Sequence, residues 1–444
     1  MLSAVARFPI MARIKSFDNT EEIESQLLRP DRFRHLFADL SKPNVIARGS
    51  GLSYCNASAI AGGRSVLSAL FNRFISFDHE LRLIRVESGL TMGELFDFAV
   101  VRGLMPPVLP GYPKITVGGA IAMNVHGKNQ HRAGNFGDHI RRLSLFHPQH
   151  GILNCTREEN SELFHLTIGG FGLTGFLLSA DIILEPLRGK SMVIYRHRVG
   201  DLVEAAELMD SMVDQSDYLY SWHDLNRKGS KFGGGTVYLE QFSNDQLPPS
   251  TGKSSSSAIR PLPWPLLNRL TVPLVCQAYA FSERQASKRE ITNLYSASFP
   301  MVGKEIYFRL FGQRGFREYQ VVFPKECWKK AVEQVAAAIK VSGTPISLAS
   351  LKLFRGERRL LNFSGDGICL ALDTPNTADS IAFFSRLDDI AINLGGIGNV
   401  AKDSRLNAAT VRAMYGGYAD FSKALRAYDP DAYFQSELRR RLDV

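Results

Sequence analysis

The order of apolar and polar positions predicts an α+β protein. In the first half of the chain, the run RLIRVE at 82–87 is typical of a strand, and Thr91 with Glu94 forms a capping box for a helix that ends at Gly103. A second helix is expected over 161–168, with Asn160 or Ser161 as its N-cap, before the strand-like run FLLSADIILEP. Elements that follow one another this closely indicate a domain with local packing.

The pattern changes after residues 186–190. Asp201 and Glu204 cap a predicted helix, and further helices are expected over 328–341 and about 380–394, the last ending at Gly395. The strand-like runs of this half are TVYLEQF, IYFRLF, YQVVF, LASLKLF and ICLALD. They predict a largely antiparallel sheet covered by helices on one face. Because 444 residues are too many for one compact core, this half forms a second domain.

Two adjacent stretches of the second half stand apart from this pattern. Residues 243–265 are rich in Ser and Pro, a composition that predicts a mobile loop. The apolar run LLNRLTVPLVCQAYAF follows, with Trp264 at its margin. This run suits a flap that binds a lipid tail or a membrane surface, and it suits a buried core segment equally well.

Charge and cysteine content narrow the classes of partner. Lys and Arg number 53 against 44 Asp and Glu, which gives a net charge of +9 and favours anionic ligands. No nucleic-acid motif accompanies the dispersed basic residues, so no nucleic-acid partner is expected. Five cysteines without CxxC spacing predict neither a metal site nor a disulfide framework. With no membrane-spanning window, and with Arg7 and Pro9 interrupting any secretion signal, a cytoplasmic protein is expected.

The segment 110–139, PGYPKITVGGAIAMNVHGKNQHRAGNFGDH, is the strongest functional signal. Its glycines leave backbone N–H groups free to contact a flat ring or a phosphate, and TVGGAIA supplies an apolar wall beside them. Upstream, Gly49 and Gly51 in VIARGSGLSYCN form a turn after a short strand, where consecutive N–H groups can converge on a pyrophosphate. Together the two loops predict a site for a large polar cofactor.

The string TVGGAIA, then HGKN, a second histidine and AGNFG resembles the second flavin-binding segment of FAD-linked oxidases of the vanillyl-alcohol oxidase (PCMH) type. Among these enzymes the chain is most similar to the decaprenylphosphoryl-β-D-ribose 2′-oxidases, from about Asn44 to the C-terminus. The resemblance implies an FAD-binding domain at 1–189, a substrate domain at 190–397, and a C-terminal segment, 398–444, that returns to the FAD domain.

The resemblance also implies non-covalent FAD, because Leu52 stands where covalent members have a histidine. Gly170, Gly172 and Gly175 satisfy GxGxxG, but a helix precedes them and a strand follows, which excludes a nicotinamide site and fits a third flavin-lining piece. The implied cofactor-binding residues are Arg48, Gly49, Ser50, Gly51, Leu52, Ser53, Tyr54, Pro110, Gly111, Thr116, Gly118, Gly119, Ala120, Asn124, His126, Gly127 and Asn129.

Flavin oxidation of a secondary alcohol needs a group that accepts the hydroxyl proton and a cation near the flavin ring. Lys402 in AKDSR matches the lysine that the family places beside flavin and substrate, as a base with a lowered pKa or as a positive charge. The competing interpretation is a surface lysine paired with Asp403. His126 and Lys128 match the family's HGK and are also assigned to catalysis, against a purely structural histidine in a glycine loop.

The implied substrate-binding residues are Tyr54, Gln320, Lys352, Phe354 and Cys369, although Cys369 is explained equally well as a small buried side chain. The chain departs from the family pattern at Gly367, Glu318 and Asn399, where asparagine, glutamine and tyrosine are expected. These positions contact substrate in the family. The identity of the oxidised sugar therefore stays open, whereas the assignment of the cofactor does not depend on these positions.

The expected activity is oxidation of the 2′-hydroxyl of a polyprenylphosphoryl ribose, with the keto product passed to a separate short-chain NAD(P)H-dependent reductase that completes an epimerisation. The lipid-linked substrate implies peripheral contact with the inner membrane. Quinone and dioxygen both remain open as electron acceptors. The alternatives are a flavin oxidase of a soluble polyol or aldonolactone, and a non-catalytic flavoprotein scaffold.

Overall fold

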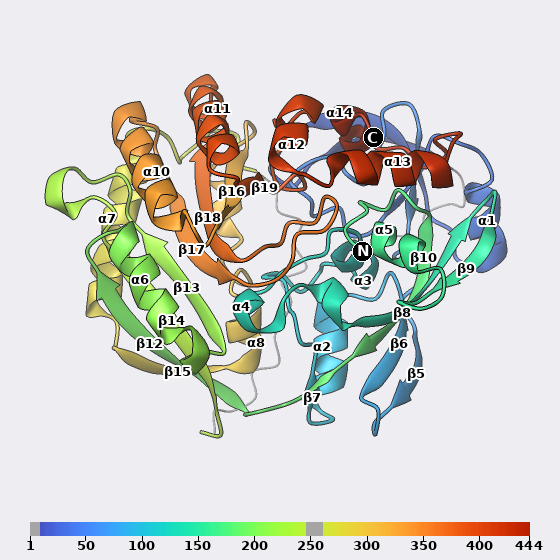
Figure 1. Ribbon diagram of the computed structural model, residues 1–444, viewed down its shortest axis with the longest axis horizontal. Helices are drawn as coiled ribbons and strands as arrows, with labels where there is room; N and C mark the ends of the chain where they lie inside the picture. Colours follow the sequence, from blue (N-terminus) through green and yellow to red (C-terminus); the bar gives the residue numbers. More distant parts are fainter. Residues whose placement is uncertain (1–8, 246–260) are drawn as a thin grey trace.

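The computed structural model describes residues 9–245 and 261–444 and has two lobes (Figure 1). One lobe contains the first part of the chain together with the C-terminal helices, and the other contains the elements from β12 to β18. Most of the loop predicted over 243–265 lies outside the described residues, and so does the start of the chain, to which the expectation about export applies.

Two sheets form the frame of the first lobe. One has the order β1-β2-β4-β3, with β2, β3 and β4 parallel to one another, and the other is antiparallel in the order β5-β6-β10-β8-β9. The strands are β1 (Ile10–Lys15), β2 (Glu22–Leu28), β3 (Val45–Arg48), β4 (Arg64–Leu67), β5 (Phe74–Asp78), β6 (Leu83–Glu87), β8 (Ile140–His147), β9 (Gly151–Cys155) and β10 (Phe176–Ile183), with β7 (Leu104–Met105) and β11 (Glu185–Pro186) paired separately. The predicted strands before and after the glycine loops are confirmed.

Short helices connect these strands: α1 (Phe33–Asp39), α2 (Met92–Val100), α3 (Val117–Ala122), α4 (Gln130–Ala133), η1 (Phe136–His139) and α5 (Ser161–Thr167). The predicted capping box is confirmed, since Thr91 Oγ1 accepts from the Glu94 N–H at 3.2 Å and Glu94 Oε2 accepts from the Thr91 N–H at 2.8 Å. Asn160 occupies the N-cap of α5 in a left-handed conformation, without a side-chain cap.

The second lobe contains two antiparallel sheets in the described part of the chain, where the sequence predicted one. Their orders are β13-β14-β12-β15 and β17-β18-β16-β19. The strands are β12 (Ser191–Val199), β13 (Tyr218–His223), β14 (Gly235–Ser243), β15 (Arg289–Asn293), β16 (Phe316–Pro324), β17 (Leu348–Phe354), β18 (Gly367–Pro375) and β19 (Ile397–Gly398). The sheets meet at β13 and β17, where Ser221 Oγ accepts from the Leu351 N–H at 3.0 Å.

One predicted strand of this lobe is wrong. IYFRLF forms the short helix α9 (Ile306–Arg309), not a strand. Phe308 and Phe311 are three residues apart, and both pack into a small aromatic cluster with Phe316, which helical spacing allows and strand alternation does not. The other predicted strand runs are confirmed.

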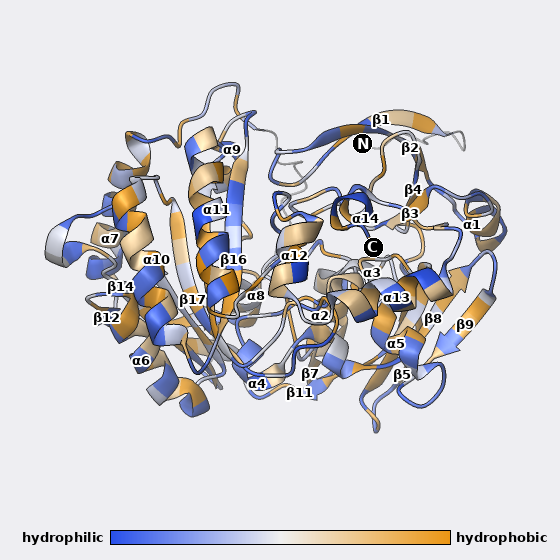
Figure 2. Ribbon diagram, turned by 45° about the horizontal axis from the view of Figure 1, so that its top comes forward, coloured by the Kyte–Doolittle hydropathy of each residue, from blue (hydrophilic) through white to orange (hydrophobic). Residues whose placement is uncertain are grey.

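Helices cover one face of the second lobe: α6 (Leu202–Met212), α10 (Trp328–Ser342) and α11 (Ala378–Asn393), with η2 (Val213–Gln215) and η3 (Gly229–Lys231) nearby in sequence. α10 and α11 carry hydrophilic and hydrophobic residues in alternation along their length (Figure 2), because each buries only one side. The remaining helices of the lobe are α7 (Thr271–Gln285) and α8 (Leu294–Ser298). The predicted helical cover and its boundaries are confirmed to within two residues.

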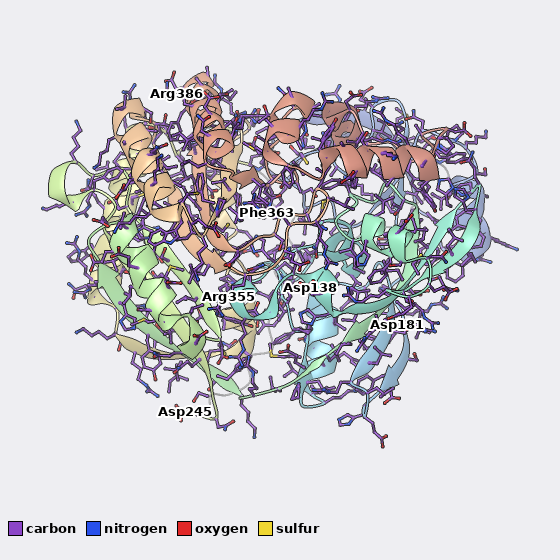
Figure 3. The ribbon with its side chains drawn as sticks, viewed as in Figure 1. Asp138, Asp181, Asp245, Arg355, Phe363 and Arg386 are labelled. Carbon is purple, nitrogen blue, oxygen red and sulfur yellow. The ribbon has the colours of Figure 1, made fainter. Side chains whose placement is uncertain are left out.

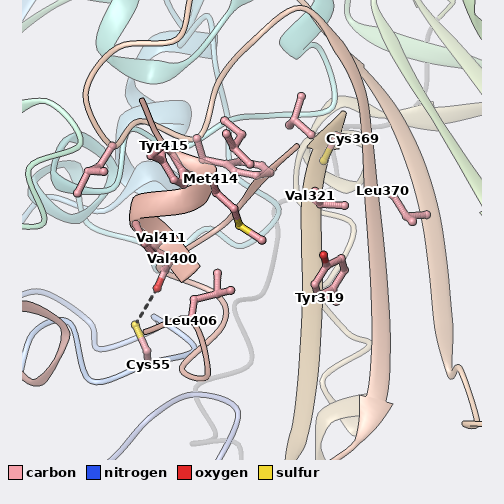
Figure 4. Close-up of a cluster of buried hydrophobic side chains, with 14 of the residues drawn as sticks. Cys55, Tyr319, Val321, Cys369, Leu370, Val400, Leu406, Val411, Met414 and Tyr415 are labelled. Carbon is pink, nitrogen blue, oxygen red and sulfur yellow. Dashed lines mark hydrogen bonds between the residues drawn. The ribbon is translucent and has the colours of Figure 1, made fainter. Parts of the chain in front are cut away.

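The C-terminal segment contacts the first lobe through α12 (Ala408–Met414), α13 (Tyr418–Tyr428) and α14 (Glu437–Leu442). The Gln435 N–H donates to the Val45 carbonyl at 2.9 Å, and the Cys55 thiol lies 3.7 Å from the Val400 carbonyl (Figure 4). A loop of the second lobe also extends toward the first lobe, and its residue Phe363 lies between the two lobes (Figure 3). The C-terminal segment is thereby fixed to the first lobe, and the Phe363 loop contacts that lobe through its carbonyl, which accepts from the Asn135 amide at 3.1 Å.

Candidate active site

A cavity of about 1150 Å³ lies between the two lobes. Its walls come from the loops after β3 and before α3, and from the faces of β14, β16, β17 and β18 that point away from the covering helices. Pockets for single small ligands range up to about 1,000 Å³. This cavity is therefore large enough for an extended cofactor with a substrate beside it.

The two glycine loops meet at one wall of the cavity. A Cβ on Gly49 would lie 2.3 Å from Thr116 Oγ1, so only glycine allows the first loop to approach the second this closely. Thr116 caps α3, and its Oγ1 accepts from the Gly119 N–H at 3.2 Å. Gly51 has φ +67°, which places the turn in the left-handed region that glycine favours. The structure thus brings together two loops that are more than 60 residues apart in sequence.

Most of the predicted cofactor-binding residues line this cavity. They are Gly49, Ser50, Gly51, Leu52, Ser53, Tyr54, Pro110, Gly111, Thr116, Gly118, Gly119, Asn124, His126 and Gly127, and the GFGLTG segment adds Gly172 and Gly175. Three predicted residues do not reach it. Arg48 packs behind the turn at Gly51, Ala120 is buried in α3, and the Asn129 amide donates to the Pro107 carbonyl at 2.8 Å. These three residues support the loops instead of lining the cavity.

Lys402 faces the cavity and forms an ion pair, although not the one considered from the sequence. Its Nζ lies 2.7 Å from Glu318 Oε1 and 5.1 Å from the centre of the Tyr54 ring, while Asp403 pairs with Arg405. Burial lowers the pKa of Lys402, but Glu318 outweighs that effect and the pKa lies above its usual value. A surface pair with Asp403 is therefore wrong. The ion pair with Glu318 favours the positively charged form of Lys402 over a base with a lowered pKa.

His126 lies at the junction of the second glycine loop and the second lobe. Its ring packs edge-on against Phe354 at 4.8 Å, and its Nε2 is 3.4 Å from the Gln320 side-chain amide. Burial, together with Lys352 and Lys402, keeps the pKa of His126 well below its usual value. The imidazole is consequently neutral and has a nitrogen that can accept a proton.

Lys128 also lines the cavity, but its ammonium group is already paired. It donates to both oxygens of Glu240, at 2.8 and 3.0 Å, and lies over the rings of Tyr218 and Tyr220. The Tyr220 hydroxyl donates to the same carboxylate at 2.9 Å. This arrangement makes Lys128 part of a fixed wall. The signal for Glu240 in the sequence is the presence of an acidic residue inside the apolar strand run TVYLEQF.

The predicted substrate-binding residues divide into two groups. Tyr54, Gln320 and Lys352 line the cavity, whereas Phe354 and Cys369 lie behind it and are almost completely buried. Within the described residues, no hydrogen bond or ion pair holds the Lys352 ammonium, and burial lowers the pKa of Lys352. A lysine without an ion-pair partner at a cavity wall is suited to an anionic ligand, because the ligand's charge would offset the cost of burying the ammonium group.

Two of the residues that depart from the family pattern make contacts at the cavity wall. The Asn399 amide donates to Gln320 Oε1 at 2.7 Å and fixes that side chain, and Glu318 is the partner of Lys402. Asp373 lies directly opposite Glu318 in the pairing of β16 with β18, and accepts from the Tyr307 hydroxyl at 2.8 Å. Neither the Asp373 nor the Tyr307 contact was predicted, because each depends on the register between distant strands.

Residues 37–156 match a family model described as an FAD binding domain. Over 98% of its length, the chain is 31% identical to the decaprenylphosphoryl-β-D-ribose oxidase of Mycolicibacterium smegmatis, and the match covers 95% of that protein. The chain belongs to the decaprenylphosphoryl-β-D-ribose oxidase family. It is an FAD-dependent oxidoreductase with the predicted α+β, PCMH-type fold.

More distant relatives share part of the chain. A D-lactate dehydrogenase of Anaerostipes hadrus is 28% identical over 33% of this chain and 32% of its own, and a human delta(24)-sterol reductase is 31% identical over 26% and 22%. Both matches cover a third of this chain or less. In the described ranges, no helix is long and apolar enough to cross a membrane, and no acidic, histidine and cysteine side chains gather as a metal site would require.

The residues at the cavity fit FAD. The backbone N–H groups at Gly49–Gly51 suit a pyrophosphate, whereas those at the start of α3 already donate to Leu90, Ser88 and Thr116. A Cβ at Gly49 would fill the narrow space between the two loops. Leu52 offers no nucleophile for covalent attachment. When bound, the flavin supplies the hydride acceptor of the reaction.

Proposed function

We propose that this protein oxidises the 2′-hydroxyl of a polyprenylphosphoryl ribose to the 2-keto sugar with non-covalently bound FAD. The observation that carries the proposal is that the side chains of Lys402 and Lys352 meet the neutral imidazole of His126 at the cavity, where the second glycine loop faces the second lobe. The membership of the chain in a family named for such a ribose oxidase supports the choice of substrate.

The charges of the cavity suit the two ends of this substrate. Lys402 supplies positive charge near the flavin loops, where charge develops as hydride leaves the sugar carbon. The unpaired ammonium group of Lys352 is available to a phosphate oxygen, and Lys304 adds a second cation at the cavity wall. His126 is held neutral between them, and we assign it to a hydrogen bond with a sugar hydroxyl.

The apolar run after Trp264 is a natural place for the prenyl chain. Its helix α7 buries Val272 and Cys276, whereas Leu270 is 80% exposed and Leu274 65% exposed. The run is therefore mostly a surface and not a core segment. Val275 and Tyr279 on the same helix line the cavity, so the exposed apolar side chains continue from the site to the outside of the molecule. A lipid tail leaving the cavity would follow this path onto a membrane surface.

This lipid contact leads to proposals about location and partner. The protein would act at the inner face of the membrane, held by the exposed side chains of α7.

The GxGxxG sequence at Gly170, Gly172 and Gly175 has helix α5 before it and strand β10 after it, an order unsuited to a nicotinamide dinucleotide. We therefore propose that a separate short-chain NAD(P)H-dependent reductase receives the keto sugar.

Anaerobic titration of the FAD-loaded protein tests the proposed substrate. Farnesylphosphoryl ribose should bleach the visible flavin band, whereas free ribose, ribitol and an aldonolactone should leave it unchanged. Bleaching by the free compounds at least as well as by the lipid-linked sugar would make the protein a soluble-polyol oxidase. Failure of all of them to bleach the band would indicate a scaffold.

The membrane contact has its own test. In sedimentation with vesicles that contain anionic lipid, Leu270→Glu combined with Leu274→Glu should reduce the bound fraction about tenfold, since each charge replaces an apolar group at the interface. Val101→Glu is the matched control, because Val101 is also highly exposed but lies after α2 in the first lobe. Equal binding by both variants would contradict the assignment of α7.

A further inference from the structure

Glu318 stands at the centre of a chain of polar groups that begins at the cavity. Lys402 lies on one side of its carboxylate at 2.7 Å. On the other side Asp373, its directly opposed residue on β18, shares the same sheet face, where opposed Cβ atoms are about 5 Å apart. Behind Asp373, the Tyr307 hydroxyl donates at 2.8 Å and lies 2.9 Å from Ser347 Oγ. All of these residues line the cavity.

Two carboxyl groups this close cannot both be ionised without a large penalty. Asp373 Oδ1 is buried and has no hydrogen-bond donor, which is unfavourable for an ionised carboxylate and is relieved if Asp373 is protonated. Burial, followed by the charge of Glu318, raises the pKa of Asp373 well above its usual value, in agreement with a neutral acid. Glu318 is then the ionised member, stabilised by Lys402.

Lys402 as a permanent cation leaves the destination of the hydroxyl proton open. Its ammonium group can receive a proton only if it loses one at the same time. The charged or titratable groups that face the Lys402 ammonium group are Glu318 on β16, Cys369 and Asp373 on β18, Lys352 on β17, and Tyr54 and His126 on the glycine loops. Of these, Glu318 is the one whose oxygen is within hydrogen-bond distance of Lys402 Nζ.

We propose that Glu318 is the final acceptor of the hydroxyl proton and acts through Lys402. The substrate O–H bond breaks and its proton joins Lys402 Nζ, while one N–H proton of Lys402 passes to Glu318 Oε1. The hydride from the same carbon leaves to the bound flavin as oxidant, so the alcohol becomes a ketone and Lys402 stays positive throughout. This inference rests on the proposed function, and makes Glu318 a proton acceptor that acts through Lys402 and that the family pattern lacks.

Substitution Glu318→Gln removes the acceptor and keeps the shape. Anaerobic reduction of bound FAD by farnesylphosphoryl ribose should slow about 100-fold at pH 7, within the range for loss of general base catalysis. The rate of the variant should then rise tenfold per pH unit until Lys402 itself loses its proton, whereas the dissociation constant of the substrate should change less than threefold. Asp388→Asn, which breaks a buried ion pair with Arg405 that is not part of the cavity, is the matched control and should keep the wild-type pH profile.

A measurement without FAD or substrate tests the ion pair directly. Competitive acetylation of the apoprotein with acetic anhydride, followed by mass spectrometry, reports the pH at which Lys402 becomes reactive. Wild-type Lys402 should react at higher pH than an ordinary lysine, and in Glu318→Gln the reactive pH should fall by at least one unit. If Glu318→Gln does not fold, Glu318→Asp, which keeps the carboxylate, should retain the high reactive pH of wild-type Lys402.

The outcomes separate the two proposals. If wild-type FAD is not reduced by the lipid-linked sugar, the proposed function fails and the relay with it. If the wild type is reduced but Glu318→Gln is equally fast, or is slowed by the same factor at every pH, the relay alone is wrong. Unchanged acetylation of Lys402 in the variant would also overturn it.

Discussion

Substitution Gly119→Ala separates the binding of FAD from the stability of the fold. Gly119 lies in α3 and lines the cavity, and the nearest atom to an added Cβ is Thr116 Oγ1 at 3.1 Å. Alanine in place of glycine inside a helix stabilises it by about 1 kcal/mol, and the tight contact with Thr116 offsets part of that gain. The apoprotein should therefore melt within a few degrees of the wild type.

The methyl group would project into the space that we assign to the cofactor. Overpacking a close contact costs about 1–3 kcal/mol, which corresponds to roughly 5- to 150-fold weaker binding of FAD. Titration of the apoprotein with FAD, followed by quenching of flavin fluorescence, measures this affinity. Circular dichroism measures the melting temperature of the same sample.

Two further glycines serve as references. Gly416 lies in an exposed turn with no atom within 4 Å of an added Cβ, so Gly416→Ala should alter neither quantity. Gly118 has Ser88 Cβ at 2.9 Å and the Ser88 carbonyl at 3.1 Å, so Gly118→Ala should lower the melting temperature itself. Wild-type affinity for FAD in Gly119→Ala, with a normal melting curve, would refute the assignment of this wall to the cofactor.

Two other predictions concern charge. Lys402→Met should keep the bound FAD and its yellow colour but lose at least about 100-fold in reduction by substrate, measured by anaerobic stopped flow; turnover at the wild-type rate would remove Lys402 from the reaction. Burial lowers the pKa of His223 from 6.5 to about 4. Because the imidazole is protonated at higher pH in the unfolded chain than in the folded one, the free energy of unfolding should fall by about 3 kcal/mol as pH drops from 6.5 to 4. In His223→Gln this contribution should be absent from urea titrations across the same window, and an identical pH dependence in both proteins would count against the assignment.

Local signals in the sequence were sufficient for much of the fold. The Thr91–Glu94 capping box, the helix from Trp328 and the strands on either side of the glycine loops depend on neighbours a few residues away, and each is found where its pattern predicts. The run IYFRLF failed because four helical residues are too few to show periodicity, and an aromatic cluster with Phe316 decides their conformation. The division of the second lobe into two sheets leaves no pattern in the nearby sequence, so it was not predicted.

The site was predicted more fully on its cofactor side than on its substrate side. Glycine is required at 49 and 118, because a Cβ there would lie 2.3 Å from Thr116 Oγ1 or 2.9 Å from Ser88 Cβ, and such a requirement leaves a mark in the sequence. The pair Lys402–Glu318 joins residues 84 positions apart, and the register of β16 with β18 places Asp373 behind it. Such pairings depend on tertiary structure, and Glu318 was noticed only as a departure from the family pattern.

The most direct test of the central claim is a crystal structure of the protein loaded with FAD. The dinucleotide should lie along Gly49–Gly51 and the start of α3, with the flavin ring between His126 and Lys402. A cofactor bound elsewhere, or a groove between the two glycine loops that stays empty while FAD is bound in solution, would contradict it.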